Sequence, residues 1–406
     1  MPVLDDYRAV TGPQTLDEVR FLAERLKGRK LLHINSTAVG GAVAETLHFL
    51  IPLFRELGID ARWEVVKGGE DFYTVVRKMR RALQGEYERF ELKDYDLYLR
   101  VQEENLGVLP AEQDLVIVHD AEPAGLIRSR DTKRSKWVWR SHMDLSQPDP
   151  VVWNFLRGII GSYDATVTSA PAFAQDLERP QAVIHPSIDP LNEKNRLMGA
   201  EEIASILDRL QVPTDKPLIT QICRLDHHSD PVGAIRSFRL AERAVSARLL
   251  LVGAPADDEP GAEDVYERVK EEIRHDPLIH LLRLPHTRHA EINAIQRASA
   301  VILQRAHREG FGFTVTEALW KGRPVIASPV GGIPLQVSHK HTGILAHSDE
   351  GTAYWIKQLF QEPALAQRLG ESGREHVRRN LLVTRQLRDY LLLLISLENP
   401  GERVSL

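Results

Sequence analysis

Residues 30–58 read KLLHINSTAVGGAVAETLHFLIPLFRELG, and this stretch decides the fold. It opens with a short apolar run at residues 30–34. Apolar side chains then recur at helical spacing over residues 42–57, and Gly58 ends the pattern as a helix stop. A second apolar run follows at residues 61–66. A strand, a helix and another strand in succession predict a parallel sheet with helices on its faces.

The same alternation continues along the chain and restarts after residue 190. We therefore predict two Rossmann-like, doubly wound α/β domains, residues 1–188 and 189–377, with a C-terminal helix at about 378–406 packing back on the first. Ligands of such sheets bind beyond the carboxyl ends of the strands, so we expect a site in a central cleft between the domains. Further predicted strands are 115–119, 137–140, 165–168, 217–222, 247–253, 279–282, 300–304 and 324–327, with helices at 314–321 and 349–360 and a charged helical insertion at 70–110.

The composition is that of an ordinary globular protein: 406 residues, 43% hydrophobic and 27% charged. With 57 acidic and 52 basic residues the net charge is −5, which argues against an extended nucleic-acid-binding surface. No apolar run approaches the roughly 20 residues of a membrane-spanning helix, and the N-terminus does not resemble a signal peptide. The single cysteine, Cys223, cannot form an intrachain disulfide. We expect a cytoplasmic protein without a membrane or nucleic-acid partner.

A glycine pair follows the first predicted strand. Asn35 begins the segment NSTAVGGAVAE, in which Gly40 and Gly41 lie just before the first helix. Paired glycines let a backbone approach a ligand closely, and the N–H groups at a helix start favour an anion. A tight turn that only starts the helix explains the same residues equally well.

The segment REGFGFTVTEAL, residues 308–319, lies between a predicted strand and a predicted helix. Its glycines, Gly310 and Gly312, and the helix N-terminus could hold a phosphate. Glu309 lies on the loop, where it could face a sugar. Glu317 lies in the helix and could accept hydrogen bonds from ribose hydroxyls. Two glutamates at this spacing arise often by chance, but the whole string in this context favours a binding site.

Two further polar clusters follow predicted strands. The sequence WRSHMD places Arg140, His142 and Asp144 in alternation at the carboxyl end of one strand, which favours a site over a packed core histidine. In the second cluster, Arg224-Leu225-Asp226, the arginine could clamp a diphosphate through two parallel hydrogen bonds. An ion pair between Arg224 and Asp226 explains this second cluster equally well.

Together these motifs resemble glycosyltransferase family 4, whose members have the GT-B fold and a retaining mechanism. That resemblance rests on the REGFGFTVTEAL segment, the strand at 322–326 and the Gly331-Gly332-Ile333 turn. The sequences HINST with its glycine pair, WRSHMDLS and PSIDPL are similar to the trehalose glycosyltransferring synthases. The similarity extends over residues 7–392, and the retaining trehalose phosphorylases share much of it.

This resemblance implies the reversible transfer of glucose from a nucleoside-diphosphate glucose to glucose, which gives α,α-trehalose. It implies that neither a metal nor another cofactor is required, and because related enzymes are often dimers, it implies a homodimer. The catalytic residues that it implies are His142 beside the transferred sugar, Arg224 at the leaving diphosphate and Glu309 at the sugar. The implied donor-binding residues are Gly40, Gly41, Arg224, Gly310, Phe311, Gly312, Thr314 and Glu317, and the implied acceptor-binding residues are Asn35, Arg140 and Asp144.

One position departs from the family pattern. The family carries a lysine five residues after the arginine, and this chain has Ser229 there, followed by Asp230 where the family has glycine. The departure of a diphosphate concentrates negative charge, so a missing cation removes part of its stabilisation, which can cost on the order of a hundredfold in rate. His227 or His228 would replace the lysine only if protonated.

Three hypotheses follow for the function: a trehalose-forming transferase, a phosphorylase that uses inorganic phosphate, and a degenerate sugar-nucleotide-binding protein. Glu317 favours the first, and Ser229 is the support for the third. We predict no metal site. Asp94-Tyr95-Asp96 resembles a metal-binding D-x-D but is interpreted as a surface segment of a charged helix, and His286 and His289 lack a further ligand.

Overall fold

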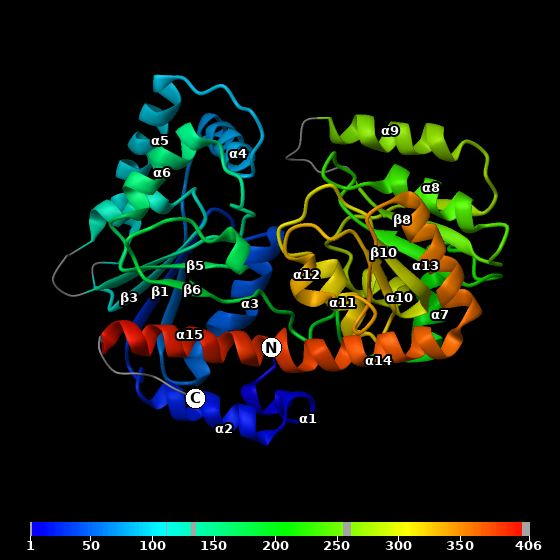
Figure 1. The fold of residues 1–406 in the computed structure, drawn as a ribbon. Helices are drawn as coiled ribbons and strands as arrows, with labels where there is room; N and C mark the ends of the chain where they lie inside the picture. Colours follow the sequence, from blue (N-terminus) through cyan, green and yellow to red (C-terminus); the bar gives the residue numbers. More distant parts are fainter. Residues whose placement is uncertain (1, 111, 131–134, 255–260, 400–406) are drawn as a thin grey trace. The chain divides into compact units, whose positions relative to one another are not determined.

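The computed structural model describes residues 2–110, 112–130, 135–254 and 261–399. The chain divides into two compact units. The N-terminal unit comprises Met1–Ser187 together with Val383–Leu406, and the C-terminal unit comprises Ile188–Leu382. Figure 1 shows the course of the chain through both units.

The N-terminal unit is built on a parallel sheet of six strands in the order β2-β1-β3-β4-β5-β6. Its central strands are buried along almost their whole length, as expected for a sheet covered on both faces. The register places His33 opposite Ile117 and His119 opposite Arg140. The strands are β1 (Lys30–Asn35), β2 (Asp60–Val65), β3 (Leu115–His119), β4 (Lys136–Arg140), β5 (Ala165–Thr168) and β6 (Gln181–Val183).

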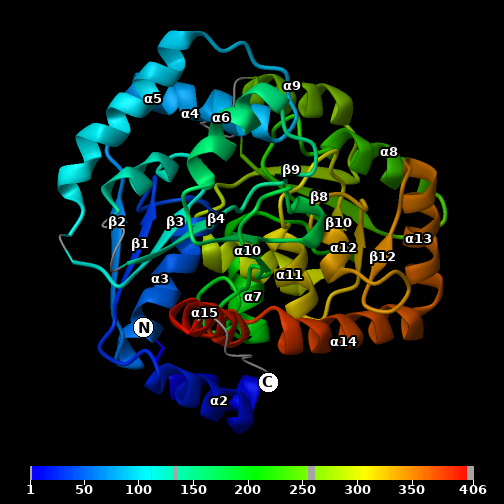
Figure 2. The same cartoon turned by 60° about the vertical axis from the view of Figure 1, so that its left-hand side comes forward.

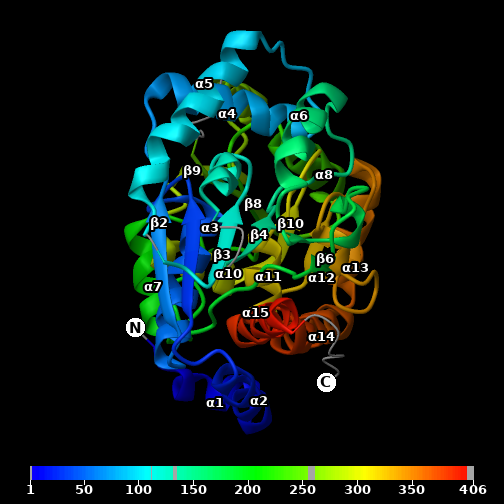
Figure 3. The same ribbon diagram turned by 90° about the vertical axis from the view of Figure 1, so that its left-hand side faces the viewer.

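The helices of this unit form two groups, which Figures 1 and 3 show apart from each other. The first group consists of α2 (Pro13–Glu24), α3 (Gly41–Glu56) and α15 (Val383–Glu398), in which α15 packs on both others. The second group consists of α4 (Glu70–Leu83), α5 (Leu92–Asn105) and α6 (Pro150–Ile160). The short helices are α1 (Arg8–Thr11) and the 3-10 turns η1 (Leu4–Tyr7), η2 (Leu106–Val108), η3 (Ala124–Ser129) and η4 (Pro171–Phe173).

The C-terminal unit has a second parallel sheet of six strands, in the order β12-β11-β10-β7-β8-β9. Its strands are β7 (Leu218–Ile222), β8 (Arg248–Gly253), β9 (Ile279–Arg283), β10 (Ser299–Gln304), β11 (Val325–Ala327) and β12 (Ile344–Leu345). Its helices are α7 (Ala200–Arg209), α8 (Pro231–Ala241), α9 (Ala262–Ile273), α10 (His289–Ala298), α11 (Phe313–Trp320), α12 (Ile333–Gln336), α13 (Asp349–Gln361) and α14 (Pro363–Asn380).

Successive side chains of the C-terminal sheet enter two separate cores. In β8, Leu249 and Leu251 pack with α8, α9 and α13, whereas Leu250 and Val252 pack with α7 and α10. Figure 2 shows these strands with α7, α10 and α13 around them. β8 therefore contributes to both faces, which explains why its sequence is a continuous apolar run rather than an alternating pattern.

Each sheet has a point where the strand order reverses direction. In the N-terminal unit it lies between β1 and β3, and in the C-terminal unit between β7 and β10. Loops that follow the two neighbouring strands diverge at such a point, and ligands of open α/β sheets bind there. This geometry fixes where each unit can present functional residues.

The apolar runs of the sequence predict ten of these strands correctly, but not the short edge strands β6 and β12. The C-terminal helix was expected at about 378–406, but α15 begins at Val383. Residues 378–382 belong to the C-terminal unit instead. Asp94, expected on the surface, is instead buried, with its carboxylate 2.7 Å from the Lys78 ammonium. Within the described residues, every helix is too short or too polar to cross a membrane.

Candidate functional site

In the C-terminal unit, the loops that follow β7 and β10 are joined by hydrogen bonds. The backbone N–H of His307 donates to the carbonyl of His228 at 2.8 Å, and the backbone N–H of Arg305 donates to the Gln221 side chain at 3.0 Å. Ser229 and Ala306 form an isolated antiparallel bridge. The two loops thus meet at the strand-order reversal and bring two sequence-predicted regions together, one from each loop.

Arg224 is the first sequence-predicted residue on this edge. Its Nε lies 3.4 Å from the Oδ2 of Asp226, and its side chain is 46% exposed while that of Asp226 is buried. The sequence offered an ion pair and a diphosphate clamp as alternatives, and this geometry is compatible with both. A guanidinium has five N–H donors, so the contact with Asp226 does not by itself prevent Arg224 from binding an anion.

The loop from Glu309 to Gly312 is held against the turn at Gly331 and Gly332. The backbone N–H of Gly332 donates to the Gly310 carbonyl at 2.8 Å. A Cβ on Gly331 would lie 1.5 Å from the carbonyl oxygen of Glu309, so only glycine fits. Gly312, at φ 87°, precedes the first residue of α11 in a left-handed conformation that favours glycine. The glycines therefore define the path of the loop toward the N-terminus of α11.

The carboxyl group of Glu309 lies among hydrogen-bond donors. Gln304 Nε2 donates to Glu309 Oε2 at 3.3 Å, and the backbone N–H groups of Gly310 and Gly312 donate to the same carboxyl group. Burial and the nearby carboxylate of Asp226 nevertheless raise the pKa of Glu309 to about 7. A carboxyl group with this pKa changes its charge near neutral pH and can serve as either donor or acceptor.

Glu317 is buried in α11 and is paired with a lysine. Its Oε1 lies 3.2 Å from Lys194 Nζ, and both side chains are almost fully buried. One turn further along, Lys321 Nζ donates to Asn195 Oδ1 at 3.0 Å, and burial lowers the pKa of Lys321 to about 7. The sequence did not single out Lys194, because it lies in an irregular segment more than a hundred residues before Glu317. It holds one face of the carboxylate in place.

Two more predicted donor-binding residues precede Glu317, one on the loop and one in the first turn of α11. Phe311 is buried and contacts the Phe313 ring edge to face at 5.3 Å between centroids, and its carbonyl accepts a hydrogen bond from Gln336 Nε2. Thr314 lies in the first turn of α11, and its carbonyl accepts a hydrogen bond from Gln296 at 3.3 Å. The backbone carbonyls of both residues are therefore engaged within the C-terminal unit.

Ser229 and Asp230, which replace the family's lysine and glycine, are both engaged in local structure. Ser229 Oγ donates to Asp226 Oδ1 at 3.1 Å. Asp230 caps α8 by accepting from the N–H of Gly233 at 2.8 Å, and it lies 3.1 Å from the buried guanidinium of Arg305. The negative charge that the substitution introduces is therefore matched by an internal arginine.

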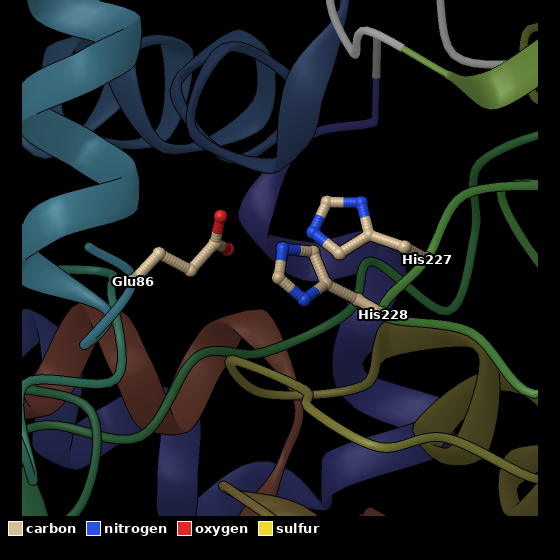
Figure 4. A group of neighbouring side chains, drawn as sticks. All are labelled: Glu86, His227 and His228. Atoms are coloured by element: carbon tan, nitrogen blue, oxygen red, sulfur yellow. The ribbon is translucent and has the colours of Figure 1, made fainter. Parts of the chain in front are cut away.

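His227 and His228 follow Asp226 on the same loop. Their ring centroids are 4.0 Å apart, with His227 exposed and His228 half-buried. Figure 4 draws the two rings; the third side chain drawn there, Glu86, belongs to the N-terminal unit. Two adjacent imidazoles would repel each other if both were protonated, so they form a weaker positive centre than one lysine.

In the N-terminal unit, the loop after β1 has the expected glycine turn. Gly40 and Gly41 have φ values of 77° and 78°, and α3 begins at Gly41. Asn35 Nδ2 donates to the Thr37 carbonyl at 2.7 Å, and Trp63 Nε1 donates to Asn35 Oδ1 at 2.8 Å. The Asn35 side chain, expected to bind an acceptor, is thus occupied in shaping the loop.

His142, which follows β4, is the end of a chain of three histidines. Its Nε2 lies 2.9 Å from His119 Nδ1, and His119 Nε2 lies 2.9 Å from His33 Nδ1. The rings are stacked, with successive centroids 5.2 Å apart. Burial lowers the pKa of His33 to about 3 and the pKa values of His119 and His142 well below the ordinary value. All three rings are therefore neutral at physiological pH.

Arg140 and Asp144, the other predicted residues of this motif, are engaged within the unit. The Arg140 guanidinium is fully buried and donates to the Thr168 carbonyl at 3.1 Å and to Ser169 Oγ at 3.4 Å. The Asp144 carboxylate accepts from the N–H of Ser146 at 2.9 Å in a local turn. These contacts give both side chains structural roles.

Asp120 was not singled out from the sequence. It is a buried residue with the left-handed φ of 64°, a strained value for aspartate. Its Oδ1 accepts from the backbone N–H of His142 at 2.7 Å. Burial and the neighbouring Glu122 carboxylate raise its pKa. The His119-Asp120 pair at the end of a strand was the signal available in the sequence, because it lies where β3 adjoins both β1 and β4.

A hollow of about 340 Å³ in the C-terminal unit is lined by residues 214–218 and Ala298. It lies at the amino end of β7, on the edge of the sheet opposite Arg224 and Glu309. None of the sequence-predicted site residues lines it. The chemistry-bearing residues gather instead at the carboxyl ends of the strands.

Two known families match the chain in succession. Residues 33–175 match a family described as the N-terminal domain of trehalose synthase, and residues 203–376 match the group 1 glycosyl transferases. A trehalose synthase of Pyrococcus horikoshii is 41% identical over 401 residues, which cover 97% of this chain and 96% of that protein. One of Rubrobacter xylanophilus is 37% identical and covers 97% of both chains.

More distant relatives share the architecture. A trehalose phosphorylase of Pleurotus pulmonarius is 26% identical over 92% of this chain and 58% of its own length. A glycosyltransferase structure from Rickettsia africae superposes with a TM-score of 0.72 at 17% identity, over 92% of this chain and all of that one. An α,α-trehalose 6-phosphate synthase structure from Burkholderia multivorans superposes with a TM-score of 0.70 at 16% identity, with the same coverage. These structures show that the fold is GT-B.

Proposed function

The chain belongs to the trehalose synthase family of GT-B glycosyltransferases, and on that basis we propose that it transfers glucose from a nucleoside-diphosphate glucose to glucose. The product in this proposal is α,α-trehalose, and the reaction is reversible. Trehalose synthases align with this chain over almost its entire length, whereas the phosphorylases match over little more than half of theirs.

The observation that carries the proposal is the edge where the β7 and β10 loops meet. An exposed arginine, Arg224, and a carboxyl group, Glu309, flank a glycine loop that ends at the N-terminus of α11. Backbone N–H groups at a helix start and a guanidinium are complementary to a diphosphate. In the proposed complex Arg224 binds the diphosphate, Glu309 and the backbone of residues 310–312 hold the glucose, and Glu317 accepts from the ribose.

The N-terminal unit supplies the remaining groups of the proposal. Gly40 and Gly41 approach the donor phosphates through their backbone, and His142 contacts the transferred sugar. We also propose that the acceptor attacks the anomeric carbon on the face that the diphosphate leaves. The leaving phosphate oxygen takes the proton of the acceptor hydroxyl. The protein then acts by positioning the reactants and stabilising charge. With Arg224 and the backbone N–H groups stabilising the diphosphate, this mechanism requires no metal.

Glu317 favours the proposal over the phosphorylase alternative. A phosphorylase replaces the nucleotide by inorganic phosphate and has no ribose to bind. Here the carboxylate of Glu317 is buried and held by Lys194 at 3.2 Å, an arrangement that costs free energy by desolvation. An oriented carboxylate on α11 therefore supports a nucleoside ligand.

The test is the reverse reaction. The protein is incubated with trehalose and a chelator in four separate reactions. Each reaction also contains one of ADP, UDP, GDP or phosphate. We expect a nucleoside-diphosphate glucose with at least one nucleotide. Arg224→Ala should lower that rate by about 10²–10³-fold, whereas Arg379→Ala, which removes an exposed arginine of α14, should not. Glucose 1-phosphate formed only with phosphate would establish the phosphorylase instead, and nucleotide binding without any product would indicate the degenerate protein.

A further inference from the structure

The three histidines of the N-terminal unit form one continuous hydrogen-bonded chain, from the interior of the sheet to the residue that follows β4. His33 and His119 are buried, at 0% and 3% exposure, and His142 is half-buried. Both ring-to-ring distances are 2.9 Å. Three neighbouring strands, β1, β3 and β4, set the spacing, so the chain is part of the sheet rather than a chance contact between flexible side chains.

Each neutral imidazole has one N–H and one acceptor nitrogen, which couples the three rings. Both nitrogens of His119 are engaged, Nδ1 with His142 and Nε2 with His33. If Nδ1 of His119 donates, its Nε2 must accept, and the reverse also holds. The chain therefore has only two hydrogen-bonded arrangements, and the proton position on His33 determines the one on His142.

The buried end decides between the two arrangements. Nε2 of His33 is buried and has no hydrogen-bond partner among the residues that the structure describes. In one arrangement this atom carries an N–H without an acceptor, and in the other it carries a bare lone pair. Buried N–H groups without a partner are rarer in proteins than under-satisfied acceptors. His33 is therefore expected to bear its proton on Nδ1 and to donate it to His119.

We propose that His33 and His119 are positioning residues that fix His142 as the Nδ1–H tautomer, so that its remaining ring nitrogen is a hydrogen-bond donor to a hydroxyl or another neutral oxygen acceptor of the sugar. His119 Nδ1 then donates to His142 Nε2, and the only ring proton of His142 lies on Nδ1. The hydrogen bond from His142 to the sugar rests on the proposed function, whereas the assignment of the tautomer does not.

The backbone at His142 is fixed independently of the ring. Asp120 accepts from the His142 N–H at 2.7 Å, and Trp139 Nε1 donates to the Asp120 carbonyl at 2.8 Å. The depressed pKa values of all three histidines, which follow from burial, agree with a neutral chain. Asp120 therefore fixes the backbone of His142, and His119 determines which nitrogen of its ring carries the proton.

The experiment is nitrogen NMR of the full chain with ¹⁵N-labelled histidine, without ligand. We expect His33, His119 and His142 each to be protonated at Nδ1 and unprotonated at Nε2. The proposal is overturned if wild-type His142 carries its proton on Nε2 or exchanges between the two tautomers. Because no activity is measured, this result stands whether or not the protein makes trehalose.

Variants at the buried end test the coupling. His33→Leu removes the donor to His119, and the His142 signal should then show a mixture of tautomers. His33→Asn keeps an N–H group near the position of Nδ1 and should restore the single form. Ile34→Val, on the same strand, is the control for packing. In the trehalose assay kcat/KM should fall about tenfold in His33→Leu and recover in His33→Asn, the factor expected for one hydrogen bond. An unchanged His142 signal in a folded His33→Leu protein would refute the coupling.

Discussion

Ser229 stands where the family has a lysine, and its surroundings show how the chain accommodates the exchange. Its hydroxyl donates to Asp226, whose other carboxylate oxygen contacts Arg224. A lysine at this position would place a second positive charge near Asp226 and near a bound diphosphate. In the proposed complex, the leaving diphosphate therefore depends on Arg224 without the help of a lysine at position 229.

Restoring the lysine should strengthen the site. We expect Ser229→Lys to raise kcat with a nucleoside-diphosphate glucose by about tenfold or more, because an added cation stabilises the leaving diphosphate. Steady-state rates measured in the trehalose-forming direction give the comparison. Ser229→Met has a similar length without the charge and should not raise the rate. A loss of activity confined to the lysine variant would mean that the site has adapted to a different ligand.

Glu309 provides a test in the absence of any ligand. Its pKa is raised from 4.5 to about 7 in the folded protein, so the folded state resists ionisation that the unfolded chain undergoes. The charge therefore destabilises the fold increasingly as the pH rises from about 4.5 to about 7. We expect the melting temperature of Glu309→Gln, relative to wild type, to increase over this range and then level off.

A control for this measurement is Glu375→Gln on α14. The Glu375 carboxylate is paired with Arg378, which lowers its pKa to about 2, so its ionisation is complete below the same pH range. The unfolded chain completes its ionisation just above its ordinary pKa of 4.5, so the melting-temperature difference from wild type should change far less there than for Glu309→Gln. If Glu309→Gln behaves in the same flat manner, Glu309 is already ionised in the folded protein at pH 5.

At the scale of elements, the site depends on how two loops pack. The Glu309 loop rests directly on the turn that precedes α12, with the Gly332 N–H bonded to the Gly310 carbonyl. Neither loop has much regular structure of its own, so their contact determines where the N-terminus of α11 lies relative to Glu309. Only small residues fit at this contact. In the sequence, this requirement was visible only as a pair of glycines.

Gly331→Ala should disrupt this contact. The added Cβ would lie 1.5 Å from the Glu309 carbonyl oxygen and would sit on a residue with φ of 54°. The loop must shift, and a displacement of about 1 Å can cost about 100-fold in rate. Gly199→Ala is the matched control, since no atom of the described residues lies within 4 Å of its Cβ and its φ is −71°. Rates close to wild type for Gly331→Ala would show that the loop position is not critical.

At the scale of the whole molecule, the last described helix belongs with the first part of the chain. α15 packs on α2 and α3, and Arg385 Nη2 donates to the His185 carbonyl within the same unit. Its apolar face, including Leu387, Leu391 and Leu394, is completely buried. The N-terminal unit is therefore completed by residues that are nearly two hundred positions away from the rest of it.

Leu394→Ala should weaken the N-terminal unit selectively. Truncating a fully buried leucine costs about 2–5 kcal/mol, and the cavity lies against α15's neighbours. Hydrogen exchange followed by mass spectrometry should show faster exchange in α2 and α3 than in wild type, with α8 of the C-terminal unit unchanged. Leu393→Ala, at a half-buried position of the same helix, should have a smaller effect. Equal acceleration in both units would mean that they unfold as one.

The sequence by itself determined the two doubly wound domains and most of their strands, because apolar runs and helical spacing are local and each run is long enough to identify. It also identified Arg224, Glu309, Glu317 and His142 as candidates, since each belongs to a short motif. It missed β6 and β12, which have three and two residues and too little pattern to detect.

Only the tertiary structure decided which side chains from other segments contact the motif residues. Lys194 on Glu317, His33 and His119 behind His142, and Arg305 beside Asp230 are contacts between segments far apart in the chain. The same packing buried Arg140, which the motif had suggested as a ligand-binding residue. Local spacing specifies which strand a residue follows. The order of strands in the sheet determines the neighbours of that residue, and this order is set by the packing of the whole unit.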